Sequence, residues 1–205
     1  MGRPRRYGAE TEADLLEAAE QVLEEGGLAA LSMRALAERT GVTTRAIYSV
    51  FTSKGHLLAR LAARGFDMLG RRVAELPVTD DPEADLVEAG LALRAFAARH
   101  PALYALAFGL DRPTADDAPS AEAARGEALA ELRARVARVG GSVDEPELGA
   151  QVRAFHALCE GLAALERRRA LQGEQAWRTA LAVCVRGIAA PRPGLADARS
   201  SGRGA

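Results

Sequence analysis

Hydrophobic residues recur along most of the chain at the three- and four-residue spacing of amphipathic α-helices. The alternation of β-branched and polar residues that is typical of strands is missing. Ala and Leu dominate an apolar fraction of 48%, and aromatic residues make up only 4%, which favours helices over strands. The pattern predicts an all-α protein of about nine helices.

Capping residues mark the first four helices. Thr11 and Asp14 predict a capping box for the first helix, which we expect to stop at the glycine pair 26–27. The next three helices have predicted N-caps at Ser32, Thr43 and Ser53. We expect the second to end at Gly41, the third to cover 44–51 and the fourth to continue to Pro77. Prolines and apolar periodicity predict five further helices, at about 82–100, 101–108, 121–139, 146–171 and 174–190.

Residues 33–52 have the spacing of a helix-turn-helix. Ala37 is small where the two short helices would touch, Gly41 allows a tight turn, and Val42, Ile47 and Val50 would close a shared core. At about 100° per residue, the second helix separates an apolar face from a polar one. The polar face carries Thr44, Arg45, Tyr48 and Ser49. It is suited to a major groove, although any short amphipathic helix has a polar outer face.

Charge along the first 60 residues favours nucleic acid. The whole chain is near neutral, with 27 basic and 28 acidic residues, so net charge alone indicates no partner. Basic residues nevertheless gather in the segment 30–60 and in the arm 1–9, which contains Arg3, Arg5 and Arg6 beside Pro4. These arginines can lie in a narrow minor groove, or the arm can be a disordered terminus.

The stretch FTSKGHLL places a cation where a helix dipole favours an acid. Lys54 follows the predicted N-cap Ser53, and neither Gly55 nor His56 supplies a carboxylate. Free backbone N–H groups, a serine cap and a lysine together form an anion site. A DNA phosphate brought close by the neighbouring helix is the anion that this pattern predicts. His56 either adds a pH-sensitive phosphate contact or only faces solvent, and we expect the second.

Residues 10–60 resemble the DNA-binding domain of TetR-family transcriptional regulators. The matching stretches are LLEAAEQVLEEGGLAALSMRALAERTGV and TTRAIYSVFTSKGHLL, with an aromatic pair at Tyr48 and Phe51 and the family's lysine at Lys54. Val50 stands where a histidine is frequent, and GHLL stands where an acid often follows the lysine. The resemblance implies DNA contacts from Thr43, Thr44, Arg45, Tyr48 and Lys54, and the polar face adds Ser49.

The rest of the chain resembles the family's ligand-binding domains. The stretch RAFAARHPALYALAFG, at 94–109, is similar to a recurring phrase in the WHG-type ligand domain, whose Trp-His-Gly motif is degraded here to HALCEG at 156–161. We expect a ligand cavity among the fourth to eighth helices, although each lining residue alone could be ordinary core. The candidate lining residues are Phe66, Met68, Phe96, Tyr104, Phe108, Leu132 and His156.

The last two helices have broad apolar faces that could cover each other or pair with a second copy in a four-helix bundle. The resemblance favours the homodimer, which would present two recognition helices to successive major grooves of a pseudo-palindromic operator. The candidate interface residues are Phe155, Cys159, Leu162, Trp177, Leu181 and Val185.

Other functions find little support in the sequence. The three histidines lie in unrelated contexts, and no nucleophile elbow, P-loop or dinucleotide fingerprint occurs near them. His156, Cys159 and Glu160 are close on one helix, but three residues of one helix do not form a metal site. Cys159 and Cys184 are interpreted as core residues. We therefore predict no enzyme, cofactor or metal, and neither a signal peptide nor a membrane span, which indicates a cytoplasmic protein.

These patterns predict four parts, which are a basic arm at 1–9, a DNA-binding domain at 10–57, a ligand and dimerisation domain at 58–190 and a disordered tail at 191–205. The function expected is a sequence-specific, homodimeric DNA-binding regulator, most simply a repressor that an unknown small-molecule effector releases from its double-stranded operator. A helical protein-interaction module without DNA binding is the alternative. It explains the second domain but not the charge pattern of residues 1–60.

Overall fold

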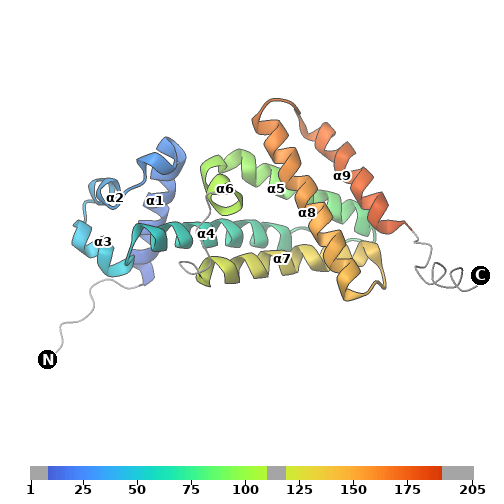
Figure 1. The fold of residues 1–205 in the computed structure, drawn as a ribbon, viewed down its shortest axis with the longest axis horizontal. Coiled ribbons are helices and arrows are strands. Elements are labelled where there is room, and N and C mark those ends of the chain that lie inside the picture. Colours follow the sequence, from blue (N-terminus) through green and yellow to red (C-terminus); the bar gives the residue numbers. More distant parts are fainter. Residues whose placement is uncertain (1–8, 110–118, 191–205) are drawn as a thin grey trace, which may run out of the picture.

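The computed structural model describes residues 9–109 and 119–190, and these residues form nine helices and no strand (Figure 1). The all-α prediction is therefore confirmed for the described residues. The arm with Arg3, Arg5 and Arg6 and the tail 191–205 lie outside them, as does most of the predicted loop 111–120. The helices are α1 (Ala9–Ala30), α2 (Met33–Thr40), α3 (Thr44–Val50), α4 (Lys54–Ala74), α5 (Pro82–Arg99), α6 (Pro101–Phe108), α7 (Pro119–Gly140), α8 (Glu145–Arg167) and α9 (Glu174–Ala189).

Helices α1 to α3 form a head at one end of the molecule (Figure 1). The head is held by a core in which Leu23, Leu36, Ile47 and Phe51 are almost completely buried. The predicted bounds of α1 are wrong at both ends, because the helix begins at Ala9, ahead of Thr11, and continues to Ala30. Only Gly27 leaves the helical conformation, with φ 70° and ψ −174°, so the glycine pair kinks α1 without ending it.

The long helix α4 joins the head to a body made of α5 to α9. It leaves the head beside α3 and runs alongside α7 through much of the body (Figure 1). Every third or fourth residue from Leu57 to Val73 is buried, which is the stripe that the sequence predicts. Small residues allow close packing, since the Cα of Ala128 on α7 lies 3.3 Å from where a Cβ on Gly70 would stand.

A buried arginine of α7 caps the carboxyl end of α4. Arg135 of α7 is 5% exposed, and its guanidinium donates to the carbonyl oxygens of Val73 at 2.7 Å, Leu76 at 2.8 Å and Pro77 at 3.3 Å. The last carbonyls of a helix have no intrahelical partner and attract cations. Arg135 therefore satisfies the carboxyl end of α4 and fixes it on α7.

Helices α8 and α9 pack on α5 at the far end of the body (Figure 1). Glu166 connects the three, because it accepts hydrogen bonds from Arg94 of α5 at 2.8 Å and from the Trp177 indole N–H of α9 at 2.8 Å. Helix α8 ends at Arg167, four residues before the predicted end, and Arg169 then adopts a left-handed φ of 58°. Nowhere in residues 9–109 or 119–190 does a helix combine the length and apolar character that a membrane span requires.

Candidate nucleic-acid interface and ligand cavity

The helix-turn-helix forms through local caps. Ser32 accepts a hydrogen bond from the Ala35 N–H at 3.0 Å and starts α2. Gly41 ends it in the left-handed region, at φ 69°, and its N–H donates to the Ala37 carbonyl at 2.9 Å. Thr43 then caps α3 by accepting from the Ala46 N–H at 3.2 Å. The N-caps predicted at Ser32 and Thr43 and the helix end predicted at Gly41 are confirmed.

The outer face of α3 is polar and open to solvent. Thr44, Arg45 and Ser49 are exposed, and Tyr48 is 52% exposed although it is a large aromatic residue. Ile47 points the other way and is completely buried. Two hydroxyls at this surface already make local hydrogen bonds. Thr43, just before α3, caps the helix, and Ser49 donates to the Ala46 carbonyl at 2.6 Å. Thr44, Arg45 and Tyr48 are therefore the side chains best placed to contact another molecule.

The start of α4 continues this surface. Ser53 is its N-cap and accepts from the His56 N–H at 3.0 Å, while Lys54, the first helical residue, is exposed. Among the described residues, the backbone N–H groups of Lys54 and Gly55 have no hydrogen-bond partner. Two free donors and a lysine at the positive end of a helix suit an anion.

His56 differs from its expected solvent-facing position. Its ring packs edge-on against Phe51, with centroids 6.0 Å apart, and its Nδ1 lies 3.4 Å from both the backbone nitrogen and the hydroxyl of Thr52. The imidazole thus turns back toward the chain before the helix, where a capping-box side chain would lie. Its contacts give His56 a structural role in the turn between α3 and α4.

Two carboxylates of α1 connect the head to the body. Glu20 is 9% exposed, accepts from Arg64 of α4 at 2.6 Å and lies 3.3 Å from His100 Nδ1. Glu24 accepts from the backbone N–H groups of Ala102 at 3.0 Å and Leu103 at 2.8 Å. These N–H groups open α6, whose N-cap residue makes no side-chain capping bond of its own. Glu24 therefore caps a body helix from the head.

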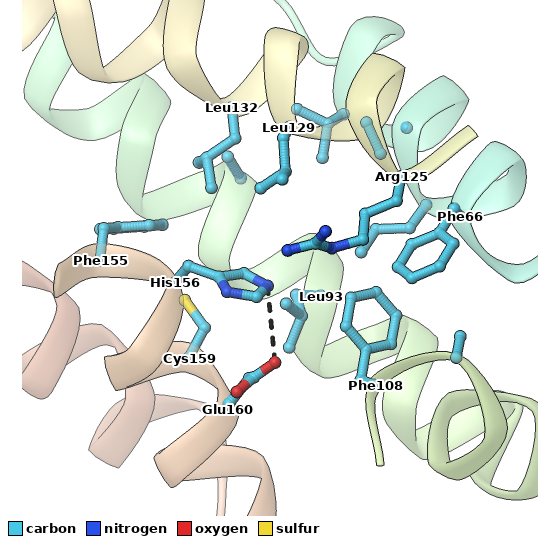
Figure 2. Close-up of a pocket in the computed structure, with 16 residues that line it drawn as sticks. Phe66, Leu93, Phe108, Arg125, Leu129, Leu132, Phe155, His156, Cys159 and Glu160 are labelled. Atoms are coloured by element: carbon cyan, nitrogen blue, oxygen red, sulfur yellow. Dashed lines mark ion pairs between the residues drawn. The ribbon is translucent and has the colours of Figure 1, made fainter. Parts of the chain in front are cut away.

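A cavity of about 270 Å³ lies among α4 to α8, where the sequence analysis places it (Figure 2). Of the seven candidate lining residues, Phe66, Phe108, Leu132 and His156 line it. The residues that the sequence analysis missed include one charged residue of α7 and several apolar ones, namely Ala89, Leu93, Arg125 and Leu129. The signal was available, because Arg125 shares the i, i+3, i+4 and i+7 stripe of Ala128, Leu129 and Leu132.

Met68, Phe96 and Tyr104 lie outside the cavity. Met68 stands about 200° around α4 from Phe66, so the two side chains cannot share a face. Phe96 packs against His100 further along α5, with centroids 5.4 Å apart. Tyr104 stacks on Phe108 at 5.0 Å, and burial raises the pKa of its phenol to about 12. It supports a wall of the cavity from behind.

Polar groups are few in the cavity. Arg125 Nη1 donates to Glu122 Oε1 at 2.6 Å, and His156 Nε2 lies 3.7 Å from Glu160 Oε1 (Figure 2). Burial lowers the pKa of His156, the positive charge of Arg125 lowers it further, and Glu160 opposes both effects. Burial also raises the pKa of Cys159, which stays a neutral thiol at pH 7.

The candidate dimer residues are not available for an interface. All six are at most 5% exposed within the single chain, and they pack into the core shared by α5, α8 and α9. Their broad apolar stripes cover each other, which is the alternative that the sequence left open. This burial corrects the predicted interface residues, which are Phe155, Cys159, Leu162, Trp177, Leu181 and Val185. Phe155 and Cys159 instead line the cavity.

Comparison with known proteins bears on both parts of the chain. Residues 15–61 match the family model described as bacterial regulatory proteins, tetR family. Residues 86–188, half of the chain, match the model described as tetracyclin repressor-like, C-terminal domain. An HTH-type transcriptional regulator of Mycobacterium tuberculosis, Rv1816, is 29% identical over 116 residues, which are 55% of this chain and 50% of that protein. The chain thus aligns with about half the length of this relative.

Two solved structures extend the similarity over most of the chain. A protein of unknown function from Rhodococcus sp. RHA1 superposes with a TM-score of 0.76 at 25% identity, over 92% of this chain and 100% of that one. BioQ in complex with its natural double-stranded DNA operator gives a TM-score of 0.63 at 25% identity, over 87% and 97%. The family models and relatives describe transcriptional regulators and not enzymes. The chain therefore belongs to the TetR family of transcriptional regulators, with a helix-turn-helix DNA-binding head.

Proposed function

We propose that this regulator is a homodimeric repressor, which a small molecule releases from a pseudo-palindromic operator. Residues 10–57 serve as the DNA-binding domain, and residues 58–190 bind the effector and the second copy. The observation that carries the proposal is the continuous surface formed by the polar face of α3 and the cationic start of α4. A cytoplasmic location follows from DNA as the partner.

Each side chain of this surface has a distinct proposed task. Arg45 and Thr44 contact base edges in the major groove, where a guanidinium can bind guanine through two hydrogen bonds. Tyr48 and Lys54 contact phosphates on either side, together with the free N–H groups at the start of α4. Thr43 and Ser49 shape the helix through their local hydrogen bonds, and the arm with Arg3, Arg5 and Arg6 adds minor-groove contacts.

A different face of α8 and α9 is proposed for dimerisation. Two of the five large exposed hydrophobic residues in the described ranges are Leu165 of α8 and Val183 of α9. Leu165 shares one exposed helix face with small residues, Ala154, Ala157 and Gly161. Small residues beside exposed apolar side chains allow two helix pairs to approach closely in a four-helix bundle.

The effector is proposed to act through α6. Phe108 at the carboxyl end of α6 lines the cavity, and the amino end of the same helix is capped by Glu24 of the head. A ligand that displaces Phe108 would move α6 and, through Glu24, change the placement of α1. Ligand binding and operator binding would then favour different arrangements, which is what release requires.

Binding to the regulator's own promoter, measured against salt concentration, tests the proposal. A repressor with several phosphate contacts loses affinity steeply as salt rises, because each neutralised phosphate adds about 0.9 to the slope of the logarithmic plot. Absent or salt-independent binding would contradict it and would favour a helical interaction module. A fragment of the same length from within a coding region serves as the competitor for specificity.

A further inference from the structure

One guanidinium projects into the cavity among apolar walls. Arg125 reaches from α7 into the space between Phe66 and His156 (Figure 2). Arginine stays charged at every physiological pH and carries five N–H donors. Among the described residues, Arg125 donates to Glu122, which is exposed and one turn away on the same helix. That bond uses Nη1 and leaves the other donors of the fork for a ligand.

The remaining walls suit an apolar body. Phe66 and Phe108 meet edge to face, with centroids 4.9 Å apart, and Leu93, Leu129 and Leu132 face them (Figure 2). The volume of about 270 Å³ is at the small end for ligand sites. At roughly 30 Å³ for each water, it would hold about nine waters, so the matching ligand has on the order of ten non-hydrogen atoms.

We propose that the cavity binds an apolar monocarboxylate, with the carboxylate on Arg125 and the hydrocarbon body against Phe66, Phe108 and Leu132. Planar guanidinium and carboxylate groups match in two parallel charge-assisted hydrogen bonds. This inference names the effector class of the proposed regulator and rests on the cavity being its effector site.

Glu160 is the competing charge, and it sets the orientation of the ligand. Its carboxylate lies by His156 and not by Arg125 (Figure 2). Because His156 is held neutral, the negative charge of Glu160 is not cancelled by the imidazole. It repels the ligand carboxylate from the α8 side and directs it toward α7. An amine ligand would have the opposite preference and would place its ammonium group toward Glu160.

Matched ligands on the full chain without DNA test the proposal. Isothermal titration compares 3-phenylpropionate and octanoate with 3-phenylpropanamide and 3-phenylpropylamine. At least one acid should bind about tenfold or more tightly than the amide, which has the same shape without the charge, and more tightly than the amine. Glu160→Gln should leave acid binding unchanged or tighter.

Arg125→Gln should lose about tenfold or more in acid affinity while the amide is unaffected. Arg133→Gln is the matched control, since Arg133 is also on α7 and paired with an exposed acid, Glu145, but lies outside the cavity. Thermal melting of each variant verifies the fold. Tighter amine than acid binding, no acid binding at millimolar concentration, or an unchanged acid affinity in a folded Arg125→Gln protein would overturn the proposal.

DNA binding measured on the same preparations keeps the two proposals apart. If the protein binds its promoter but no acid, the ligand class is wrong and the regulatory function stands. If an acid binds through Arg125 without releasing the promoter, the site is correct and the proposed release is wrong.

Discussion

Glu24 of the head accepts a hydrogen bond from the backbone N–H of Leu103 in the body, at 2.8 Å. The same carboxylate accepts from Ala102 at 3.0 Å, so one side chain of α1 closes the open end of α6. The other end of this short helix reaches the cavity at Phe108. The head and the cavity are therefore joined through a single helix of eight residues, in addition to the continuous α4.

Glu24→Ala should lower the free energy of unfolding by about 2 kcal/mol, because two backbone donors lose a charged acceptor. Chemical denaturation followed by circular dichroism measures the change. Glu17→Ala provides the control, since Glu17 is an exposed acid on the same helix. Equal stability of the two variants would show that the Glu24 cap contributes little.

Lys54→Ala and Arg45→Ala should weaken DNA binding in different ways. Loss of a phosphate contact at Lys54 should reduce affinity for all sequences alike and lower the salt slope by about 1. Loss of base readout at Arg45 should cost about 1–3 kcal/mol on the operator and relax preference at one position. Arg72→Ala, at an exposed arginine near the end of α4, controls for net charge. A sequence-selective loss from Lys54→Ala, or unchanged preference in Arg45→Ala, would contradict these roles.

Asp85 should contribute acid-sensitive stability. Arg138 and Thr79 hydrogen-bond its carboxylate and lower its pKa from 3.8 to about 2. Because the folded pKa is the lower one, the contribution is complete above about pH 4 and disappears as the pH falls toward 2. The stability difference between the wild type and Asp85→Asn should therefore narrow over this interval in urea titrations. Asp80→Asn, at an exposed neighbour, should show no such narrowing.

Val183→Arg should convert the dimer to a monomer, because two copies would bury like charges at the proposed α8 and α9 interface. Val183 is 59% exposed, so the change should not disturb the core. Val78→Arg adds the same charge at a 69% exposed valine before α5 and should remain dimeric. Sedimentation analysis distinguishes the two. A dimeric Val183→Arg protein would place the interface elsewhere.

Features that depend on neighbouring residues could be predicted from the sequence. The caps at Ser32, Thr43 and Ser53, the turn at Gly41 and the two faces of α3 all follow from residues within one turn of each other. They also define most of the candidate DNA surface. The predicted stop of the first helix at the glycine pair is wrong because only Gly27 leaves the helical conformation, and α1 continues on both sides of it.

Features that depend on which helix faces which could be predicted only in part. An apolar stripe indicates burial but not the partner, so Trp177 and Leu181 fitted a dimer interface as well as the intramolecular core in which they lie. The cavity mixes residues of five helices, and Met68 differs from Phe66 only in its direction around α4. Arg125 lies on the same stripe as Ala128, Leu129 and Leu132, so its position on the cavity side of α7 is visible in the sequence, whereas its partners across the cavity are not.

Selection of bound DNA from a random pool tests the central claim most directly. Purified protein is equilibrated with the pool at physiological salt, and the bound fraction is sequenced after several rounds, alongside an Arg45→Ala control. Two recognition helices related by two-fold symmetry predict an enriched inverted repeat, with half-sites about 34 Å or one helical turn apart or a multiple of it. Preference at one position of each half-site should weaken in the control. Enrichment of no sequence above the starting pool, with folded protein, would contradict a sequence-specific regulator.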